Sequence, residues 1–148
     1  MKTIVLVGCG KAKRDSESPA RDMYIGPLFK RARLYAELYG DTWRILSAKY
    51  GLLTPGEKIQ PYDERIESKT KLGKNLWNLT VRNAVATSLL KWVGDNEFER
   101  VKFVCLAGAE YLTFFDVDSD LRNGCVIEKP LEGMGIGQRL KFLTERTK

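Results

Sequence analysis

The 148-residue sequence contains no histidine. This absence excludes a histidine general base, a Ser-His or Cys-His pair and nearly all common zinc sites. Catalysis by side chains would therefore depend on Asp, Glu, Lys, Tyr or Cys.

Cysteine and long apolar runs are also scarce. Cys9, Cys105 and Cys125 are an odd number without a CxxC spacing, which argues against a disulfide framework. No apolar run approaches the roughly 18 residues of a membrane span. The short apolar run near the N-terminus is followed by charged residues, which indicates a first strand rather than a signal peptide. We therefore expect a cytoplasmic protein that does not associate with membranes.

Basic residues are the most abundant charged group, and the net charge is +6. An excess of positive charge favours an anionic partner, of which nucleic acid is the commonest, although a solvated basic surface is the plain alternative. The basic residues cluster at 11–14, at 30–33 and at 69–74. Two of these clusters flank the polar segments described below, so we expect nucleic acid or a phosphorylated ligand.

Apolar patterns along the chain alternate between strand and helix. This alternation predicts one three-layer α/β domain over residues 1–148, with a mainly parallel central sheet of about four strands flanked by helices. The expected strands are 3–8, 43–46, 101–107 and 126–127, and the expected helices are 27–39, 72–93, one beginning near 109, and 136–145.

The long helical pattern has two apolar stripes, which predicts a helix covered on two sides and ended by Gly94 and Asp95. One stripe contains Leu76, Leu79, Ala86, Leu90 and Val93, and the other contains Trp77, Val81, Ala84 and Trp92.

Polar side chains are concentrated in the connection that follows the second strand. Ser47, Lys49 and Tyr50 come directly after the strand, and Gln60, Tyr62 and Asp63 end the connection. A rigid strand end can hold such groups at a cleft. An aromatic ring such as Tyr62 can stack on a base, whereas Asp63 is equally able to cap a turn.

Right-handed crossovers would bring the loops after residues 8, 46 and 107 to one crevice. In the first loop, glycines around Cys9 and Lys11 let backbone amides approach a phosphate or a base, but the spacing matches neither GxGxxG nor the Walker motif. A tight turn with a solvated lysine is the alternative. Cys9 is either a nucleophile whose thiolate Lys11 favours or a small apolar residue at a strand end.

Two further segments add candidate groups to the crevice. Glu110 and Tyr111 follow the third strand, where an acid is also favoured by a helix dipole. Gly133, Gly135 and Gly137 precede the last helix, where backbone amides bind anions, unless the glycines serve only flexibility. We expect Gly135 and Arg139 to contact the substrate.

Several of these segments together resemble a known family. ILSAKYGLL at 45–53 followed by IQPYD at 59–63 resembles the hallmark of YaaA-like proteins. CGKAKRD, PARDMYIGPLFKRARLYAE and PLEGMGIGQRLKFL resemble a small bacterial and phage branch of that superfamily. The matched positions are Ser47, Tyr50, Gly51, Gln60, Pro61 and Tyr62, together with Cys9, Lys11, Tyr24 and Gly135 for the small branch.

The resemblance covers the N-terminal half and the last twenty residues, and 64–100 carries no matching motif. It implies DNA binding, a link to DNA repair or DNA modification, and cleavage of an N-glycosidic bond. The chain is much shorter than the larger YaaA proteins, which leaves little room for a separate DNA-binding element.

We therefore expect an enzyme that processes a nucleic-acid base, most concretely an N-glycosidase (a hydrolase similar to DNA glycosylases) acting on a modified or damaged base. Its oxocarbenium-like transition state needs a carboxylate and hydrogen-bond donors, and no metal or redox cofactor is expected. The expected catalytic residues are Asp63, then Glu110, and Lys49. The expected substrate-binding residues are Cys9, Gly10, Lys11, Tyr24, Ser47, Tyr50, Gln60, Tyr62, Tyr111, Gly135 and Arg139.

Among these residues, Tyr62 or Tyr50 would stack on the base, Gln60 would read its edge, and Lys11 or Lys49 would hold a phosphate. Three alternatives stay open: a binding protein without chemistry, a nucleoside or nucleotide hydrolase or transferase, and an enzyme that uses Cys9.

Overall fold

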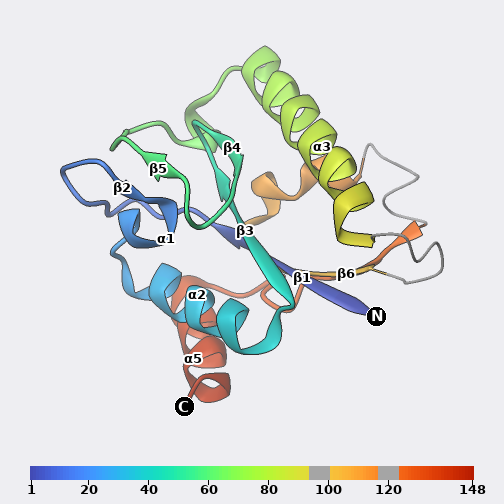
Figure 1. Cartoon of the computed structure of the whole chain (residues 1–148). Coiled ribbons are helices and arrows are strands. Elements are labelled where there is room, and N and C mark those ends of the chain that lie inside the picture. The colour runs from blue at the N-terminus through green and yellow to red at the C-terminus, as the bar shows by residue number, and fades with distance from the viewer. Residues whose placement is uncertain (94–100, 117–123) are drawn as a thin grey trace.

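The computed structural model describes residues 1–93, 101–116 and 124–148 as an α/β domain built on a five-stranded sheet (Figure 1). The strand order is β4-β3-β1-β6-β7, with β4 antiparallel to β3 and the other neighbours parallel. The mainly parallel sheet is confirmed, with one strand more than the four expected. The bounds are Lys2–Gly8 for β1, Thr42–Ser47 for β3, Gly51–Leu53 for β4, Val101–Leu106 for β6 and Val126–Glu128 for β7.

The additional strand β4 depends on Gly51. This residue pairs with Ser47 across a tight turn and has a φ of 74°, a backbone conformation that favours glycine. The chain then continues to β5 (Lys58–Ile59), which pairs with β2 (Ser18–Pro19) in a separate two-stranded sheet. The polar connection after β3 therefore contains two short strands that are not among the expected strands.

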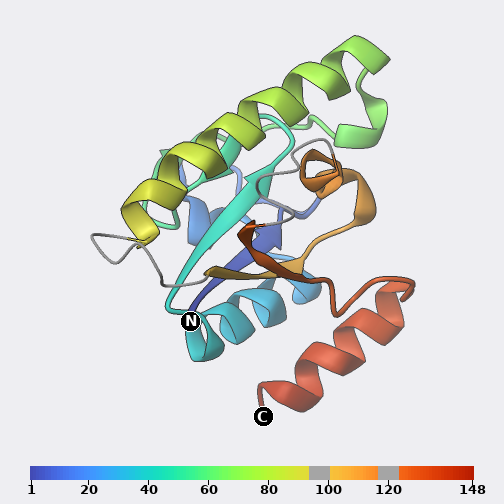
Figure 2. The same ribbon diagram turned by 90° about the vertical axis from the view of Figure 1, so that its right-hand side faces the viewer.

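Side chains of β1 alternate between the two faces of the sheet, because successive residues of a strand point to opposite sides. Ile4 and Leu6 pack into the core under α3, and Val5 and Val7 pack into the core under the other helices. Figure 2 shows α3 on one side of the sheet and α2 and α5 on the other. These helices are α1 (Ala20–Met23), α2 (Pro27–Tyr39), α3 (Lys71–Val93) and α5 (Ile136–Arg146).

The long helix α3 is covered on one side only. Trp77 and Val81 are buried, whereas Leu76 and Leu79 are 55% and 45% exposed. The expectation of a helix covered on both sides is therefore wrong for the side chains that the structure describes. The predicted helix end at Gly94 and Asp95, and the side chains of Leu90 and Val93, lie outside the described residues.

The expectation of an α-helix that begins near residue 109 is also wrong. Two 3-10 turns, Ala109–Tyr111 and Thr113–Phe115, follow β6 in its place. Leu112 joins the two turns with φ −110° and ψ 1°, outside the α-helical range, and Leu112, Phe114 and Phe115 are all buried. The shorter turns keep all three on the core.

Within the described residues, no helix is long and apolar enough to cross a membrane.

The one-sided burial of α3 gives a direct test. Val81→Ala removes packed atoms from the core, so we expect it to lower the free energy of unfolding by about 2 kcal/mol. Leu79→Ala, on the exposed face, should change that energy by less than about 0.5 kcal/mol. Urea denaturation followed by circular dichroism measures both values. Equal losses for the two variants would mean that α3 is covered on both faces.

Candidate functional site

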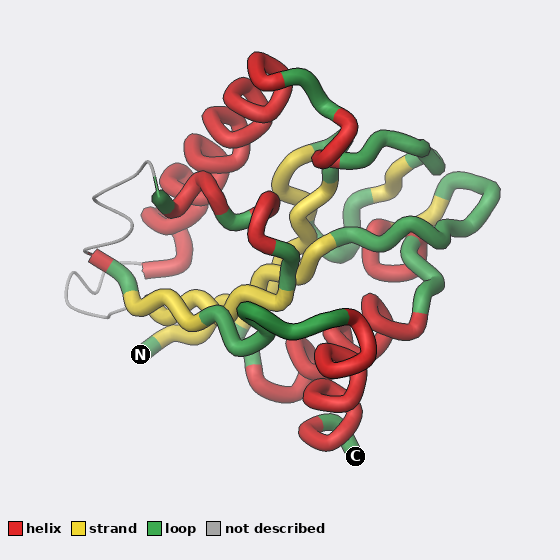
Figure 3. Tube along the Cα trace, turned by 180° about the vertical axis from the view of Figure 1, so that it is seen from behind, coloured by secondary structure: helices red, strands yellow, loops and turns green. Residues whose placement is uncertain are grey.

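A cavity of about 420 Å³ lies at the edge where β1 and β6 end. Figure 3 shows this edge from behind, with loops continuing from the strands. Gly8 ends β1, and Ala107 approaches it so closely that a Cβ added at residue 8 would lie 3.0 Å from the Ala107 Cβ. The lining comes from the loop after β1, α2, residues 63–67, the end of β6 and its following turn, Leu131 and α5.

The polar part of the lining contains charges of both signs. The cations are Lys11, Lys13, Arg65 and Arg139, and the carboxylates are Asp63, Glu64 and Glu67. Glu64 pairs with Lys69 at 3.5 Å, outside the lining. None of the four cations has a carboxylate within ion-pair distance in the described part of the chain. The cavity therefore offers positive charge that the described residues do not neutralise.

The remaining lining is mainly apolar and comes from both sides of the α2–α5 interface. Its members include Leu28, Phe29, Ala32, Leu106, Leu131, Ile136 and Leu143. Ile136 in the first turn of α5 is 75% exposed, which is unusual for an isoleucine beside a core. An apolar wall beside charged groups is typical of sites that bind small molecules with an aromatic part.

Cys9 is the first residue beyond β1, and its backbone N–H donates to the Leu46 carbonyl at 3.0 Å. Its half-buried sulfur lies 3.4 Å from the Tyr111 hydroxyl. The Tyr111 ring in turn packs edge-on against Trp77, with 5.7 Å between centroids. The turn after β6 thus holds one phenol against the thiol, and both residues line the cavity.

Behind the cavity, three hydroxyl groups form a buried chain. The Ser47 hydroxyl lies 2.7 Å from that of Tyr62, which lies 2.6 Å from that of Tyr24. The Ser47 oxygen also accepts from the amides of Lys49 and Tyr50 at 3.3 and 3.0 Å. Because these amides use both lone pairs of the oxygen, Ser47 must donate its proton to Tyr62, and Tyr62 must donate to Tyr24.

Burial keeps these phenols protonated. It raises the pKa of Tyr24 to about 12, and it raises the pKa of Tyr62 and of Tyr111 still further, with the Cys9 sulfur adding to each increase. Neutral phenols can donate hydrogen bonds at physiological pH. Each of the three is therefore a donor rather than a base.

Lys13 connects the hydroxyl chain to the cavity. Its ammonium nitrogen lies 4.4 Å from the centroid of the Tyr62 ring and donates to the Lys11 carbonyl at 3.2 Å. Burial lowers the pKa of Lys13, while the charges of Cys9 and Asp63 act in the opposite direction. A lysine with a lowered pKa is a stronger acid than an exposed one.

Of the residues predicted for the site, six line the cavity: Cys9, Gly10, Lys11, Asp63, Tyr111 and Arg139. Tyr24, Ser47 and Tyr62 form the hydroxyl chain behind it. Lys49, Tyr50, Gln60, Glu110 and Gly135 lie outside the lining.

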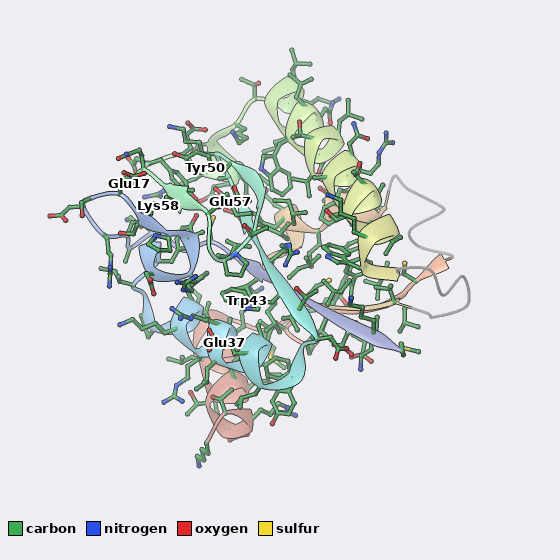
Figure 4. The ribbon with its side chains drawn as sticks, viewed as in Figure 1. Glu17, Glu37, Trp43, Tyr50, Glu57 and Lys58 are labelled. Carbon is green, nitrogen blue, oxygen red and sulfur yellow. The ribbon has the colours of Figure 1, made fainter. Side chains whose placement is uncertain are left out.

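The residues outside the lining have other contacts. The hydroxyl of Tyr50, which is labelled in Figure 4, donates to the Gln60 carbonyl at 3.4 Å and accepts from the Gln60 amide at 3.3 Å. These contacts fasten the turn after β3 to the connection beside β5. Glu110 pairs with Lys74 at 3.5 Å. The Gly135 amide donates to the Gln138 side chain at 3.0 Å. These groups are thus engaged within the protein.

Four further charged residues line the cavity and were not predicted for the site: Lys13, Glu64, Arg65 and Glu67. Lys13 belongs to the basic cluster that begins at Lys11, so its position two residues further on was the available signal. Arg65 and Glu67 lie in the stretch without a recognisable motif, and no pattern there indicates a cavity.

Metal ligands do not gather anywhere in the part of the chain that the structure describes: no three Cys, Asp or Glu side chains there are arranged to hold an ion.

The Ser47 hydroxyl should contribute strongly to stability. We expect Ser47→Ala to lower the free energy of unfolding by about 2 kcal/mol, because two amides and the Tyr62 hydroxyl lose a buried partner. The exposed Ser68→Ala serves as the control and should have an effect below about 0.5 kcal/mol. Urea denaturation would disprove this role for Ser47 if both variants matched the parent protein.

The raised pKa of Tyr24 predicts a loss of stability in alkaline solution. The unfolded chain releases this proton near pH 10 but the native state holds it to about 12, so unfolding becomes easier as the pH rises through that interval. We expect the free energy of unfolding to fall by at least about 2 kcal/mol between pH 10 and 12. The free energy of unfolding of Tyr24→Phe should fall less steeply with pH than that of Tyr39→Phe, in which an exposed phenol is removed. If the free energy of unfolding depended on pH in the same way for both variants, a raised pKa of Tyr24 would be contradicted.

Comparison with known proteins places the chain in a family. Over 65 residues it is 35% identical to the uncharacterized protein YfjM of Bacillus subtilis (strain 168), an alignment that spans 40% of this chain and only 43% of YfjM. No solved structure matches the chain. The model of a family of unknown function, DUF6884, matches residues 4–145, and the chain therefore belongs to the DUF6884 family.

Proposed function

We propose that the protein hydrolyses an N-glycosidic bond and releases a modified or damaged nucleic-acid base. The observation that carries this proposal is the lining of the cavity, which combines the Asp63 carboxylate with the donors Lys13 and Tyr111 beside an apolar wall. Cleavage of a C–N bond to a sugar needs a carboxylate near the anomeric carbon and a donor near the departing base. Both kinds of group are available in one cavity.

The apolar wall gives the base a place to bind. Leu28, Phe29 and Ile136 would cover its flat face, and their side chains provide no groups that react with it. Tyr62 and Tyr50, which the sequence assigned to stacking, do not line the cavity. In this proposal Tyr62 is a positioning residue, because its ring lies under the Lys13 ammonium.

In the proposed reaction a water molecule adds to the anomeric carbon while the bond from that carbon to the base nitrogen breaks. The electron pair of the broken bond leaves with the base, and the Lys13 ammonium gives this nitrogen a proton. Asp63 accepts a proton from the attacking water and stabilises the positive charge on the sugar. Proton exchange with solvent restores both side chains, and the products are the free base and the sugar hydroxyl.

The similarity of the motif to YaaA-like proteins supports the choice of a nucleic-acid base as substrate. The family and YfjM carry no described activity, so the choice of substrate rests on that similarity and on the site. The cytoplasmic setting is likewise a proposal. A binding protein without chemistry is the alternative that the same cavity allows.

Removing the carboxylate of Asp63 tests the mechanism. We expect Asp63→Asn to lower the turnover number by about 100-fold or more, because the amide can neither accept the proton nor balance the charge on the sugar. Glu110→Gln is the matched control, since Glu110 lies outside the cavity lining and should leave turnover within about twofold. Released base is measured by mass spectrometry on a panel of modified oligonucleotides and nucleotides.

Thermal unfolding of both variants should match that of the parent protein. Full turnover by Asp63→Asn would remove this residue from the mechanism. Tight binding of a panel member without any released base would favour the binding protein instead.

A further inference from the structure

The positive charge of the cavity exceeds what its own carboxylates balance. Lys69 neutralises Glu64, so the cations Lys11, Lys13, Arg65 and Arg139 face the two carboxylates of Asp63 and Glu67. Like charges held together repel one another unless a ligand compensates them. The excess of two positive charges matches a phosphate monoester, which carries up to two negative charges at neutral pH.

Elsewhere, the basic clusters are partly neutralised by ion pairs. On α2, Arg33 contacts Asp22 at 3.0 Å and Glu37 at 2.6 Å. At the start of α3, Lys74 contacts Glu110 at 3.5 Å. A protein that binds duplex DNA needs a run of available cations along an outer face. In the described part of the chain, the four cations of the cavity share one site and none of them has a carboxylate within ion-pair distance.

Backbone geometry around these cations leaves room for an anion. The Arg139 Nε donates to the Met134 carbonyl at 2.9 Å, which fixes the guanidinium near the end of β6. There the Arg139 Nη1 lies 3.9 Å from the position of a Cβ added to Gly108. A Cβ added to Gly10 would have only the Phe29 Cβ within 4 Å, at 3.9 Å. Gly10 and Gly108 therefore place no side chain of their own in the space beside Lys11 and Arg139.

We propose that the cavity takes a free nucleoside monophosphate, whose terminal phosphate is bound by Lys11 and Arg139 while its base lies on the apolar wall. The volume of about 420 Å³ falls within the range of about 300–1,000 Å³ that is usual for small-molecule sites. This inference rests on the proposed function for the identity of the base-bearing ligand, and it narrows the substrate from nucleic acid to a single nucleotide.

Isothermal titration calorimetry tests the phosphate site without requiring turnover. The probes are the four common deoxynucleoside 5′-monophosphates, the matching nucleosides, inorganic phosphate, and single- and double-stranded 12-mers. We expect at least one monophosphate to bind at least about 30-fold more tightly than its nucleoside, and inorganic phosphate to compete with it.

Arg139→Gln and Lys11→Gln should each weaken binding of that monophosphate by about tenfold or more and leave binding of the nucleoside unchanged. Two controls lie outside the cavity lining, Arg146→Gln on the same helix and Lys30→Gln on α2, and both should bind as the parent protein does. Circular dichroism verifies that each variant is folded.

Equal affinity for nucleosides and monophosphates, or binding of the 12-mers with no binding of any monophosphate, would overturn the inference. Monophosphate binding without released base would leave the inference standing and remove the proposed hydrolysis. Base release from oligonucleotides with no preference for a terminal phosphate would support the proposed hydrolysis and contradict the monophosphate site. The two proposals therefore fail separately.

Discussion

The side chain of Ser47 is completely buried at the end of β3, and its position connects four segments of the chain. Its hydroxyl accepts a hydrogen bond from the Tyr50 amide in the turn to β4 and is hydrogen-bonded to Tyr62 in the later connection. The Tyr62 hydroxyl is in turn hydrogen-bonded to that of Tyr24. Its carbonyl accepts from the Trp77 indole of α3 at 2.9 Å. Loss of the hydroxyl would release the turn and the connection together, so the wall of the cavity depends on a group that does not line it.

This arrangement divides the polar connection into two functions. Tyr62 points into the hydroxyl chain, whereas its neighbour Asp63 lines the cavity. One short motif thus both supports the site and contributes to it. A long polar motif is therefore not evidence that each of its residues touches a ligand.

The parallel strands could be predicted because their apolar runs are continuous, as expected for strands covered on both faces. The strand β4 could not be predicted, because it has only three residues and its turn depends on the positive φ of Gly51. The turns after β6 begin with the residues of a helix start, and no pattern in the sequence marks the break at Leu112 that separates them. For the site, glycines and charges after strand ends indicated Cys9, Lys11 and Asp63, but Arg65 reaches the cavity through tertiary folding alone.

The lengths of the two outermost strands of the main sheet have a consequence for the behaviour of the protein at high concentration. Among the described residues, β4 and β7 are the outermost strands and each contains three residues, so each edge presents few free amide and carbonyl groups. A long, regular edge would act as a template on which a second molecule could add its own strand. The short edges limit such growth, and the sheet has little tendency to extend from one molecule into an aggregate.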